Sequence, residues 1–281
     1  MSNGHIYNKN IPVHALKQND FPFVMEDIAY KNPYDFTKKH RHDYLEIILL
    51  REGGGRQWID FTQIEMQDNS CYIILPKQVH LLRRNENTKG FAIQCLQTFL
   101  NSSHLLNYLQ QLNQPVIFEN DLEKYAAISR YAELAQIMHT NKKELARHGS
   151  HHLLQAFLFH LLCLKADFKW SDKGNNIHHQ FMILVENNFS EKHAVQEYTQ
   201  ELNISEAKLS ALTRKHLGLT PLQVIHNRIV LEAKRLLAFD DQSHKEIAYQ
   251  LGFKTPPQFT RFIRNKTGLT PSGLQKECKN Q

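Results

Sequence analysis

Apolar and polar positions follow two different periods along this chain, and the change of period divides it. Between residues 21 and 96, short runs rich in β-branched and aromatic side chains alternate with turn residues, whereas beyond residue 105 apolar side chains recur every three or four positions. The first pattern is typical of β-strands and the second of amphipathic helices, so we expect an α+β protein. The predicted strands span residues 44–50, 57–61, 71–75, 80–84 and 91–96.

Short strands at such regular spacing favour a small antiparallel barrel or sandwich. The glycine-rich segment 51–56, REGGGR, predicts a hairpin between the first two strands. Three apolar helical stripes follow the strands, and they either cover the open side of the barrel or pair two subunits. Core and interface stripes look alike in a sequence, so both interpretations stay open. The stripes consist of Leu105, Leu109 and Leu112; of Ile128, Tyr131, Ala132, Ala135 and Met138; and of Leu154, Phe157, Leu158, Leu161 and Leu162.

Near the end of the chain, the sequence predicts two short helices joined by a tight turn. Ser243 and Glu246 form the S-x-x-E capping box that begins a helix, and Gly252 supplies the positive φ that ends it. We expect the Thr255 side chain to cap the next helix, whose first residue, Pro256, lacks only an N–H that would have no intrahelical partner. These signals predict a helix-turn-helix motif.

The same pattern occurs about fifty residues earlier, in the segment 198–221. Asn203 takes the place of Gly252 there, because asparagine also tolerates the left-handed conformation. The tetrapeptide Gly-Leu-Thr-Pro closes both copies. The segment 221–239 between them predicts one long helix, so the last part of the chain is expected to be all-α, with two helix-turn-helix motifs joined by that helix.

Two such motifs on one long helix resemble the DNA-binding domain of the AraC/XylS family of bacterial transcription regulators. The resemblance covers about the last hundred residues, and it departs from the family at Leu274-Gln275, where an aromatic-Arg pair is usual. It implies a non-enzymatic regulator that binds double-stranded DNA, forms a homodimer and contacts RNA polymerase. The motifs are S-x-x-x-L from Ser205, R-x-x-x-E-A-K-R-L-L from Arg228, I-A-x-x-L-G-F from Ile247 and both copies of G-L-T-P.

The charge of the chain agrees with a nucleic-acid partner. The formal net charge is +6, and from Ser205 onward 13 Lys and Arg stand against 6 Asp and Glu. The positive charge therefore coincides with the predicted DNA-binding region. Four scattered cysteines without a C-x-x-C pair, no secretory leader and no apolar run near ~20 residues indicate a cytoplasmic protein that does not cross a membrane.

We predict two domains with a short connection between them. Residues 1–168 form the cupin-like sensing and helical dimerisation domain, and residues 178–281 form the DNA-binding domain. The linker is residues 169–177, because KWSDKGNN within it is short, polar and contains a glycine.

A cluster of chemically active residues lies in the predicted sheet. The pattern H-x-H-x3-E-x6-G, followed by P-x-x-x-H, resembles the two motifs of the cupin barrel, in which metal-binding members use the histidines and the glutamate as ligands. AraC-type sensor domains keep this pattern around a small organic effector. We therefore expect an effector-binding group without a metal or cofactor, while a metal site stays open as the alternative. The residues are His40, His42, Glu46 and His80.

We expect the second helix of each motif to enter a major groove, with its N-terminal half near the base edges. Free N–H groups at helix starts, together with lysines and arginines, would hold phosphates. In the second motif Gln258 suits adenine and Arg261 suits guanine, whereas Arg264 suits a phosphate. The predicted reading residues are Ala207, Ser210, Ala211 and Arg214 in the first motif, and Pro257, Gln258, Thr260, Arg261 and Arg264 in the second.

Three function classes follow from these patterns. The leading prediction is a sequence-specific transcription regulator whose barrel senses a small molecule. The second is a cupin-type metal-dependent enzyme with a tethered DNA-binding domain, which needs a metal with an open coordination position. The third is a regulator controlled by a protein partner in place of an effector.

Overall fold

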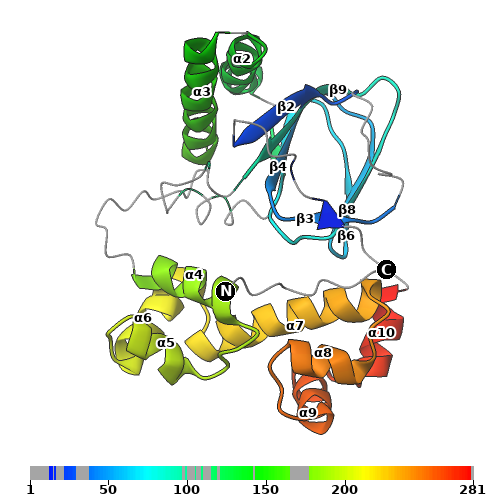
Figure 1. Ribbon diagram of the computed structural model, residues 1–281, viewed down its shortest axis with the longest axis vertical. Coiled ribbons are helices and arrows are strands. Elements are labelled where there is room, and N and C mark those ends of the chain that lie inside the picture. The colour runs from blue at the N-terminus through cyan, green and yellow to red at the C-terminus, as the bar shows by residue number, and fades with distance from the viewer. Residues whose placement is uncertain are drawn as a thin grey trace. The chain divides into compact units, whose positions relative to one another are not determined.

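The structure is a computed structural model in which the chain divides into two compact units, one within residues 12–170 and one within residues 171–281 (Figure 1). The predicted linker, apart from Ile177, lies outside the described residues, and so does Leu112 of the first apolar stripe. The structure describes residues 13–14, 16, 22–29, 38–96, 99, 105, 109, 115–118, 121–141, 143–164 and 177–279.

The N-terminal unit contains two antiparallel sheets and a short parallel pair. The larger sheet has the strand order β10-β7-β4-β9-β2, the smaller has the order β6-β5-β8, and β1 pairs with β3. An apolar cluster with side chains from both sheets packs between them. The strands are β1 (Val13–His14), β2 (Phe23–Asp27), β3 (Arg41–His42), β4 (Leu45–Glu52), β5 (Gly55–Ile59), β6 (Thr62–Glu65), β7 (Ser70–Ile74), β8 (His80–Arg84), β9 (Lys89–Cys95) and β10 (Val116–Ile117).

Strand β4 is buried on both faces, and this explains its unbroken apolar run. Ile48 and Leu50 join the cluster between the sheets. Ile47 and Leu49 point the other way and join a second cluster with residues of α2 (Leu122–His139) and α3 (Glu144–Cys163). Successive side chains of a strand face opposite sides, so a strand in the middle layer needs apolar residues at every position.

The predicted hairpin at residues 51–56 is wrong. Strand β4 pairs with β7 and β9, whereas β5 pairs with β6 and β8, so this connection crosses from one sheet to the other. Gly54 and Gly55 have φ values of 114° and 96°, which only glycine adopts readily. A Cβ at Gly53 would lie 2.4 Å from the backbone of Gln67. The glycines therefore allow a sheet crossing and not a turn between neighbours.

The two long helices of this unit pack side by side against the outer face of the larger sheet (Figure 1). The predicted stripes supply most of the buried residues of α2 and α3, such as Ile128 on α2 and Phe157 on α3. Tyr131 and Met138 of the α2 stripe are only half-buried, however. Among the residues that the structure describes, no helix is both long and apolar enough to cross a membrane.

The C-terminal unit is built around the long helix α7, with α5 and α6 at one end and α8 and α9 at the other (Figure 1). Helix α7 has the predicted bounds, and it contacts α4, α6, α8, α9 and α10. The helices are α4 (Ile177–Asn188), α5 (Val195–Glu201), α6 (Glu206–Leu217), α7 (Pro221–Phe239), α8 (His244–Gln250), α9 (Pro256–Thr267) and α10 (Pro271–Lys279).

The turn chemistry of both motifs agrees with the sequence except at one cap. Gly252 and Asn203 have φ values of 78° and 51°, and Ser243 forms the expected capping box. The Thr255 side chain, however, caps nothing at the start of α9. Prolines at the first two helical positions remove their N–H groups, and the next one, on Gln258, donates to the Thr255 backbone carbonyl at 3.1 Å.

Candidate DNA-reading surface and candidate effector site

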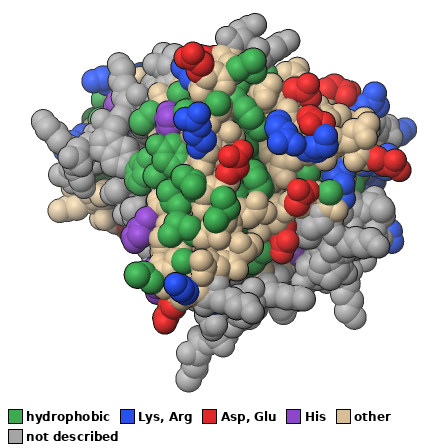
Figure 2. All heavy atoms as spheres, turned by 90° about the horizontal axis from the view of Figure 1, so that it is seen from above, with side chains coloured by type: hydrophobic (Ala, Val, Ile, Leu, Met, Phe, Trp, Pro, Cys, Tyr) green, Lys and Arg blue, Asp and Glu red, His purple; other side chains and the backbone are tan. Residues whose placement is uncertain are grey.

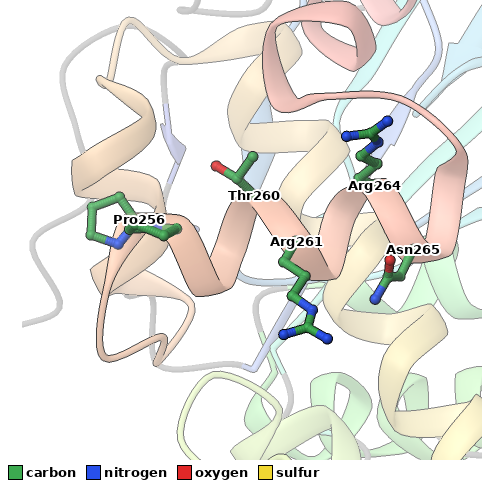
Figure 3. Close-up of a pocket in the computed structure, with 6 residues that line it drawn as sticks. Pro256, Thr260, Arg261, Arg264 and Asn265 are labelled. Carbon is green, nitrogen blue, oxygen red and sulfur yellow. The ribbon is translucent and has the colours of Figure 1, made fainter.

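Helix α9 presents a polar, cationic face to solvent. The side chains predicted to read DNA from this helix are all exposed, and six residues line a shallow hollow of about 650 Å³ on it. Figure 3 shows Arg261 and Asn265 along one side of this surface and Thr260 and Arg264 along the other. The hollow is lined by Pro256, Pro257, Thr260, Arg261, Arg264 and Asn265.

The guanidinium groups of this face are available to a ligand. Within the described part of the chain, neither Arg261 nor Arg264 lies within 4 Å of a carboxylate. Asn265 follows Arg261 by four residues and therefore shares its helical face, although it was not among the predicted reading residues. A face with two unpaired guanidiniums and three amide or hydroxyl side chains can donate hydrogen bonds to base edges and to phosphates.

Helix α6 presents a smaller and less cationic face. Ala207, Ala211 and Arg214 are exposed, whereas Ser210 is half-buried. Lys208 is also exposed on this helix, and it was not among the predicted residues. The helix starts with a side-chain cap, in which Ser205 accepts from the N–H of Lys208 at 3.3 Å. The small residues leave room for close approach of another surface.

Apolar anchors fix both candidate reading helices to the rest of the unit. Phe259 and Ile263 of α9 are fully buried, and Leu209 of α6 is fully buried as well. Phe262 is only half-buried and packs against His226 of α7, with ring centroids 5.1 Å apart. The exposed faces are therefore held at fixed positions along α7.

The family-like motif on α7 forms a buried ion network. Arg228 donates to Glu186 of α4 at 2.6 Å and 2.9 Å, and to Glu232 one turn further along at 3.0 Å. Arg235 donates to the same oxygen of Glu232 at 3.2 Å. The guanidinium of Arg228 also lies 3.8 Å from the centroid of the Phe189 ring. These residues join α4 to α7, so their role is structural and does not involve the reading faces.

In the N-terminal unit, three of the four predicted effector residues converge at one end of the space between the sheets. His42, Glu46 and His80 are buried, and their nearest ligand atoms all lie within 4.8 Å of one another. Glu46 Oε2 is 3.6 Å from His42 Nε2 and 3.7 Å from His80 Nε2. The other carboxylate oxygen accepts from the Gln94 amide at 3.0 Å.

The fourth predicted residue, His40, lies beside the cluster. Its ring centroid is 4.1 Å from that of His80, and the two residues form an isolated antiparallel bridge. Burial lowers the pKa of His40 to about 4 and lowers the pKa of His80 well below its ordinary value. The neighbouring imidazoles hold the pKa of Glu46 at about 2, against the effect of its burial. Two neutral imidazoles and a carboxylate are therefore the forms present near pH 7.

Gln57 on β5 is a polar residue of this interior that sequence reasoning missed. Its side chain is fully buried, and neither its amide oxygen nor its amide nitrogen has a hydrogen-bond partner among the described residues. It pairs directly with Leu82 and Ile64, which both pack on the cluster between the sheets. Directly paired residues point to the same side of a sheet, so Gln57 faces the interior. No motif surrounds it in the sequence.

Large apolar side chains also remain exposed on the two helices of this unit. Leu134 and Ile137 of α2 are 50% and 65% exposed, and Leu145 of α3 is 84% exposed. Figure 2 shows hydrophobic side chains gathered near the centre of one face of the molecule, with acidic and basic groups around them. Large exposed apolar patches on a protein commonly mark interaction surfaces.

Comparisons with known proteins cover both units. A family model described as an AraC-like ligand binding domain matches residues 23–162, and one described as a helix-turn-helix domain matches residues 198–277. The HTH-type transcriptional activator RhaS of Enterobacter sp. (strain 638) is 21% identical over 248 residues, which cover 85% of this chain and 87% of the relative. RhaS of Citrobacter koseri is 21% identical over 254 residues, which cover 87% and 89%. Among solved structures, ToxT from Vibrio cholerae is 13% identical with a TM-score of 0.43, over 91% of this chain and 98% of that one.

Proposed function

The chain belongs to the AraC/XylS family of transcription regulators, and from this premise we propose that it reads two adjacent DNA segments under the control of a small effector in its N-terminal barrel. The observation that carries the proposal is the repeated helix-turn-helix motif, in which α6 and α9 each turn an exposed face outward. Catalysis has no part in this function.

The two helices would read DNA in different ways. Arg261 is proposed to donate two hydrogen bonds to a guanine, and Gln258 to pair with an adenine. Arg264, on the other side of the hollow, is proposed to hold a phosphate. Two prolines begin α9, so few backbone N–H groups are free there, and side chains must supply most of its phosphate contacts.

On α6, Ala207 and Ala211 would approach thymine methyl groups closely. The remaining proposed reading residues are Ser210, Arg214, Pro257 and Thr260.

The single chain would thus recognise two boxes on one side of the duplex. Helix α7 joins the two motifs without a break, so their separation is set by a rigid element of 19 residues. Major-groove segments on one face of DNA recur about every 34 Å, or 10–10.5 base pairs. We propose that each motif occupies one such segment.

The effector is proposed to lie between the two sheets, near His42, Glu46 and His80. The interior there offers apolar walls from both sheets and a few convergent polar groups, which is the usual composition of a small-molecule site. Gln57 adds an amide that has no partner of its own. A buried amide without hydrogen bonds costs about 1–3 kcal/mol, so a bound ligand that satisfies it gains affinity.

A screen of small metabolites by thermal shift tests the effector proposal, because a ligand bound only by the folded state raises the melting temperature. Gln57→Leu should melt higher than the natural chain without ligand, since an unpaired amide is removed, and it should respond less to the ligand. Gln63→Leu, the same change at an exposed position of the neighbouring strand β6, is the matched control and should keep the response. A Gln57→Leu chain with an unchanged response would remove Gln57 from the site.

The proposal extends to the partners and the domain boundaries. The exposed apolar residues of α2 and α3 are proposed to pair two chains into a homodimer. Residues 1–168 would carry sensing and pairing, residues 178–281 would bind DNA, and residues 169–177 would connect them. Contact with RNA polymerase and a cytoplasmic location follow from regulation of transcription at bacterial promoters.

A further inference from the structure

We propose that His178 and His216 form a pH-sensitive contact that holds the reading helix α6 against the start of α4, and that protonation of both rings releases α6. The two imidazole rings are stacked, with centroids 4.1 Å apart and an angle of 2° between their planes. His178 is the second residue of α4, and His216 lies in the last turn of α6. The two helices pack against each other at this contact.

The two rings differ in their surroundings. His178 is 7% exposed, whereas His216 is exposed. Burial disfavours the charged form of an imidazole, and so does the partial positive charge at the start of a helix. The end of a helix has the opposite effect, because its free carbonyl groups favour a cation. The first proton is therefore expected on His216.

The stack tolerates one proton but not two. A protonated imidazole can lie over a neutral ring, as other cations lie over aromatic faces. Two protonated rings with centroids 4.1 Å apart repel each other instead. Groups that interact in this way bind their protons in two steps, and here the second step favours separation of the rings.

The carboxylates described on α4, α5, α6 and α7 are engaged elsewhere or lie at the far end of their helix. The first turn of α4 contains no acidic residue, and His216 follows two cations, Arg214 and Lys215, in the last turn of α6. The other described cations of these helices are Lys208, Arg228, Lys234 and Arg235. The carboxylates and their positions are Glu186 and Glu232 with Arg228, Glu201 with Lys192, Glu197 with the backbone N–H of Ala194, and Glu206 in the first turn of α6.

The second motif has a permanent charge at the equivalent position. Lys266 is the eleventh residue of α9, as His216 is the eleventh residue of α6. Burial, and then the charge of Lys266, lower the pKa of His226 on α7. This position therefore faces an imidazole of a neighbouring helix in both motifs, but only the first motif can gain or lose a charge there near neutral pH.

The contact should be intact above about pH 7 and weaken as the pH falls through the ordinary range of histidine, near 6.5. The sign follows from the second proton, which the separated rings bind more readily than the stacked rings do. Release of the last turn of α6 would move the exposed face that carries Ala207, Ala211 and Arg214. This consequence for DNA binding rests on the proposed function of α6, whereas the pH-sensitive contact itself does not.

The test is amide hydrogen exchange of the full chain, followed by mass spectrometry and corrected for the intrinsic effect of pH. We expect the protection of α6 to fall by about 5- to 10-fold between about pH 7.5 and about pH 5.5. His216→Phe keeps a stacking ring that cannot be protonated, so its α6 should stay protected at both pH values. His216→Ala removes the ring, so its α6 should be less protected at both. A natural chain with equal protection at both pH values would overturn the proposal, and so would an equal fall in His216→Phe.

The matched control is His244→Phe at the start of α8. The ring of His244 contacts the Gln275 side chain at 3.4 Å, and this variant should keep the pH dependence of α6. Loss of that dependence in the control would overturn the assignment to the stacked pair.

DNA binding decides the consequence separately. On a duplex selected from a random pool, His216→Phe and the natural chain should bind alike at about pH 7.5, and His216→Phe should bind about 5-fold more tightly at about pH 5.5. The comparison cancels the protonation of the other histidines, because both proteins contain them. Equal affinities at both pH values, with a pH-dependent α6, would leave the contact standing and contradict the reading role of α6.

Discussion

Replacing Gly252 by alanine should destabilise the C-terminal unit more than the same change at Gly268, although the two glycines have nearly the same backbone conformation. Their φ values are 78° and 77°. A Cβ at Gly252 would lie 2.2 Å from the backbone carbonyl oxygen of Ser190, whereas a Cβ at Gly268 would meet nothing within 4 Å. Comparing the two alanine variants therefore separates the destabilisation due to the left-handed conformation from that due to a steric clash with the backbone.

The two costs have different magnitudes. Placing an L-residue in the left-handed region destabilises the folded state by about 1–2 kcal/mol. Alanine also lowers the conformational entropy of the unfolded chain relative to glycine, which stabilises the folded state by about 0.4–1 kcal/mol. Gly268→Ala should therefore lower the free energy of unfolding by about 1 kcal/mol. At Gly252 the backbone must also move by about 1 Å to clear Ser190, and such overpacking adds about 1–3 kcal/mol.

Thermal unfolding of a fragment spanning residues 171–281 measures the difference. A domain of this size loses about 4–8 °C in melting temperature per kcal/mol, so Gly268→Ala should melt several degrees lower and Gly252→Ala at least twice as far. Equal losses would show that the approach of Gly252 to Ser190 contributes nothing. No loss in either variant would contradict the assignment of left-handed glycines to both helix ends.

Three further predictions concern the same unit. Arg261→Ala should weaken binding to a specific duplex by about 1–3 kcal/mol and relax the preference at one base pair. Arg264→Ala should instead weaken binding to all sequences alike and reduce the slope of log affinity against log salt concentration by about one. Equal losses of affinity on specific and scrambled duplexes for Arg261→Ala would remove Arg261 from the reading residues. Arg228→Met should lower the free energy of unfolding in urea by about 2–3 kcal/mol, because Glu186 loses both hydrogen bonds from Arg228 and Glu232 loses one. Unchanged stability would contradict the ion network. Burial lowers the pKa of His226 to about 4, so the folded unit binds this proton less readily than the unfolded chain does. The free energy of unfolding, measured by calorimetry, should therefore decrease as the pH falls from 6.5 to 4. His226→Leu should flatten that dependence, and an equal decrease in both proteins would contradict the reasoning.

Local signals in the sequence predicted the C-terminal unit closely. Helix α7 begins and ends at the predicted residues, and Gly252 and Asn203 have the predicted positive φ. These features depend on contacts a few residues apart, which the sequence displays directly. The predicted side-chain cap at Thr255 is wrong, because two consecutive prolines remove the first N–H groups of α9. The next N–H, on Gln258, donates to the backbone carbonyl of Thr255.

The N-terminal unit was predicted less completely, because its contacts join distant segments. The five predicted strands lie within about two residues of β4, β5, β7, β8 and β9, whereas the other strands were not predicted. The glycines at 53–55 predicted a hairpin where the chain changes sheets. The short edge strand β6, with four mostly exposed residues, gave no apolar pattern to detect. The inward orientation of Gln57 follows from the register in which β5 pairs with β8, where Gln57 lies opposite Leu82. Such a register joins distant segments and cannot be read from one sequence.

The central claim is that one chain reads two DNA segments with two linked motifs. Hydroxyl-radical footprinting on a duplex selected from a random pool tests it most directly. We predict two protected major-groove segments per chain on the same face of the duplex, about 10 base pairs apart, and loss of protection at one of them only in Arg261→Ala. A single protected segment, or protection that is equal on any sequence, would contradict the account.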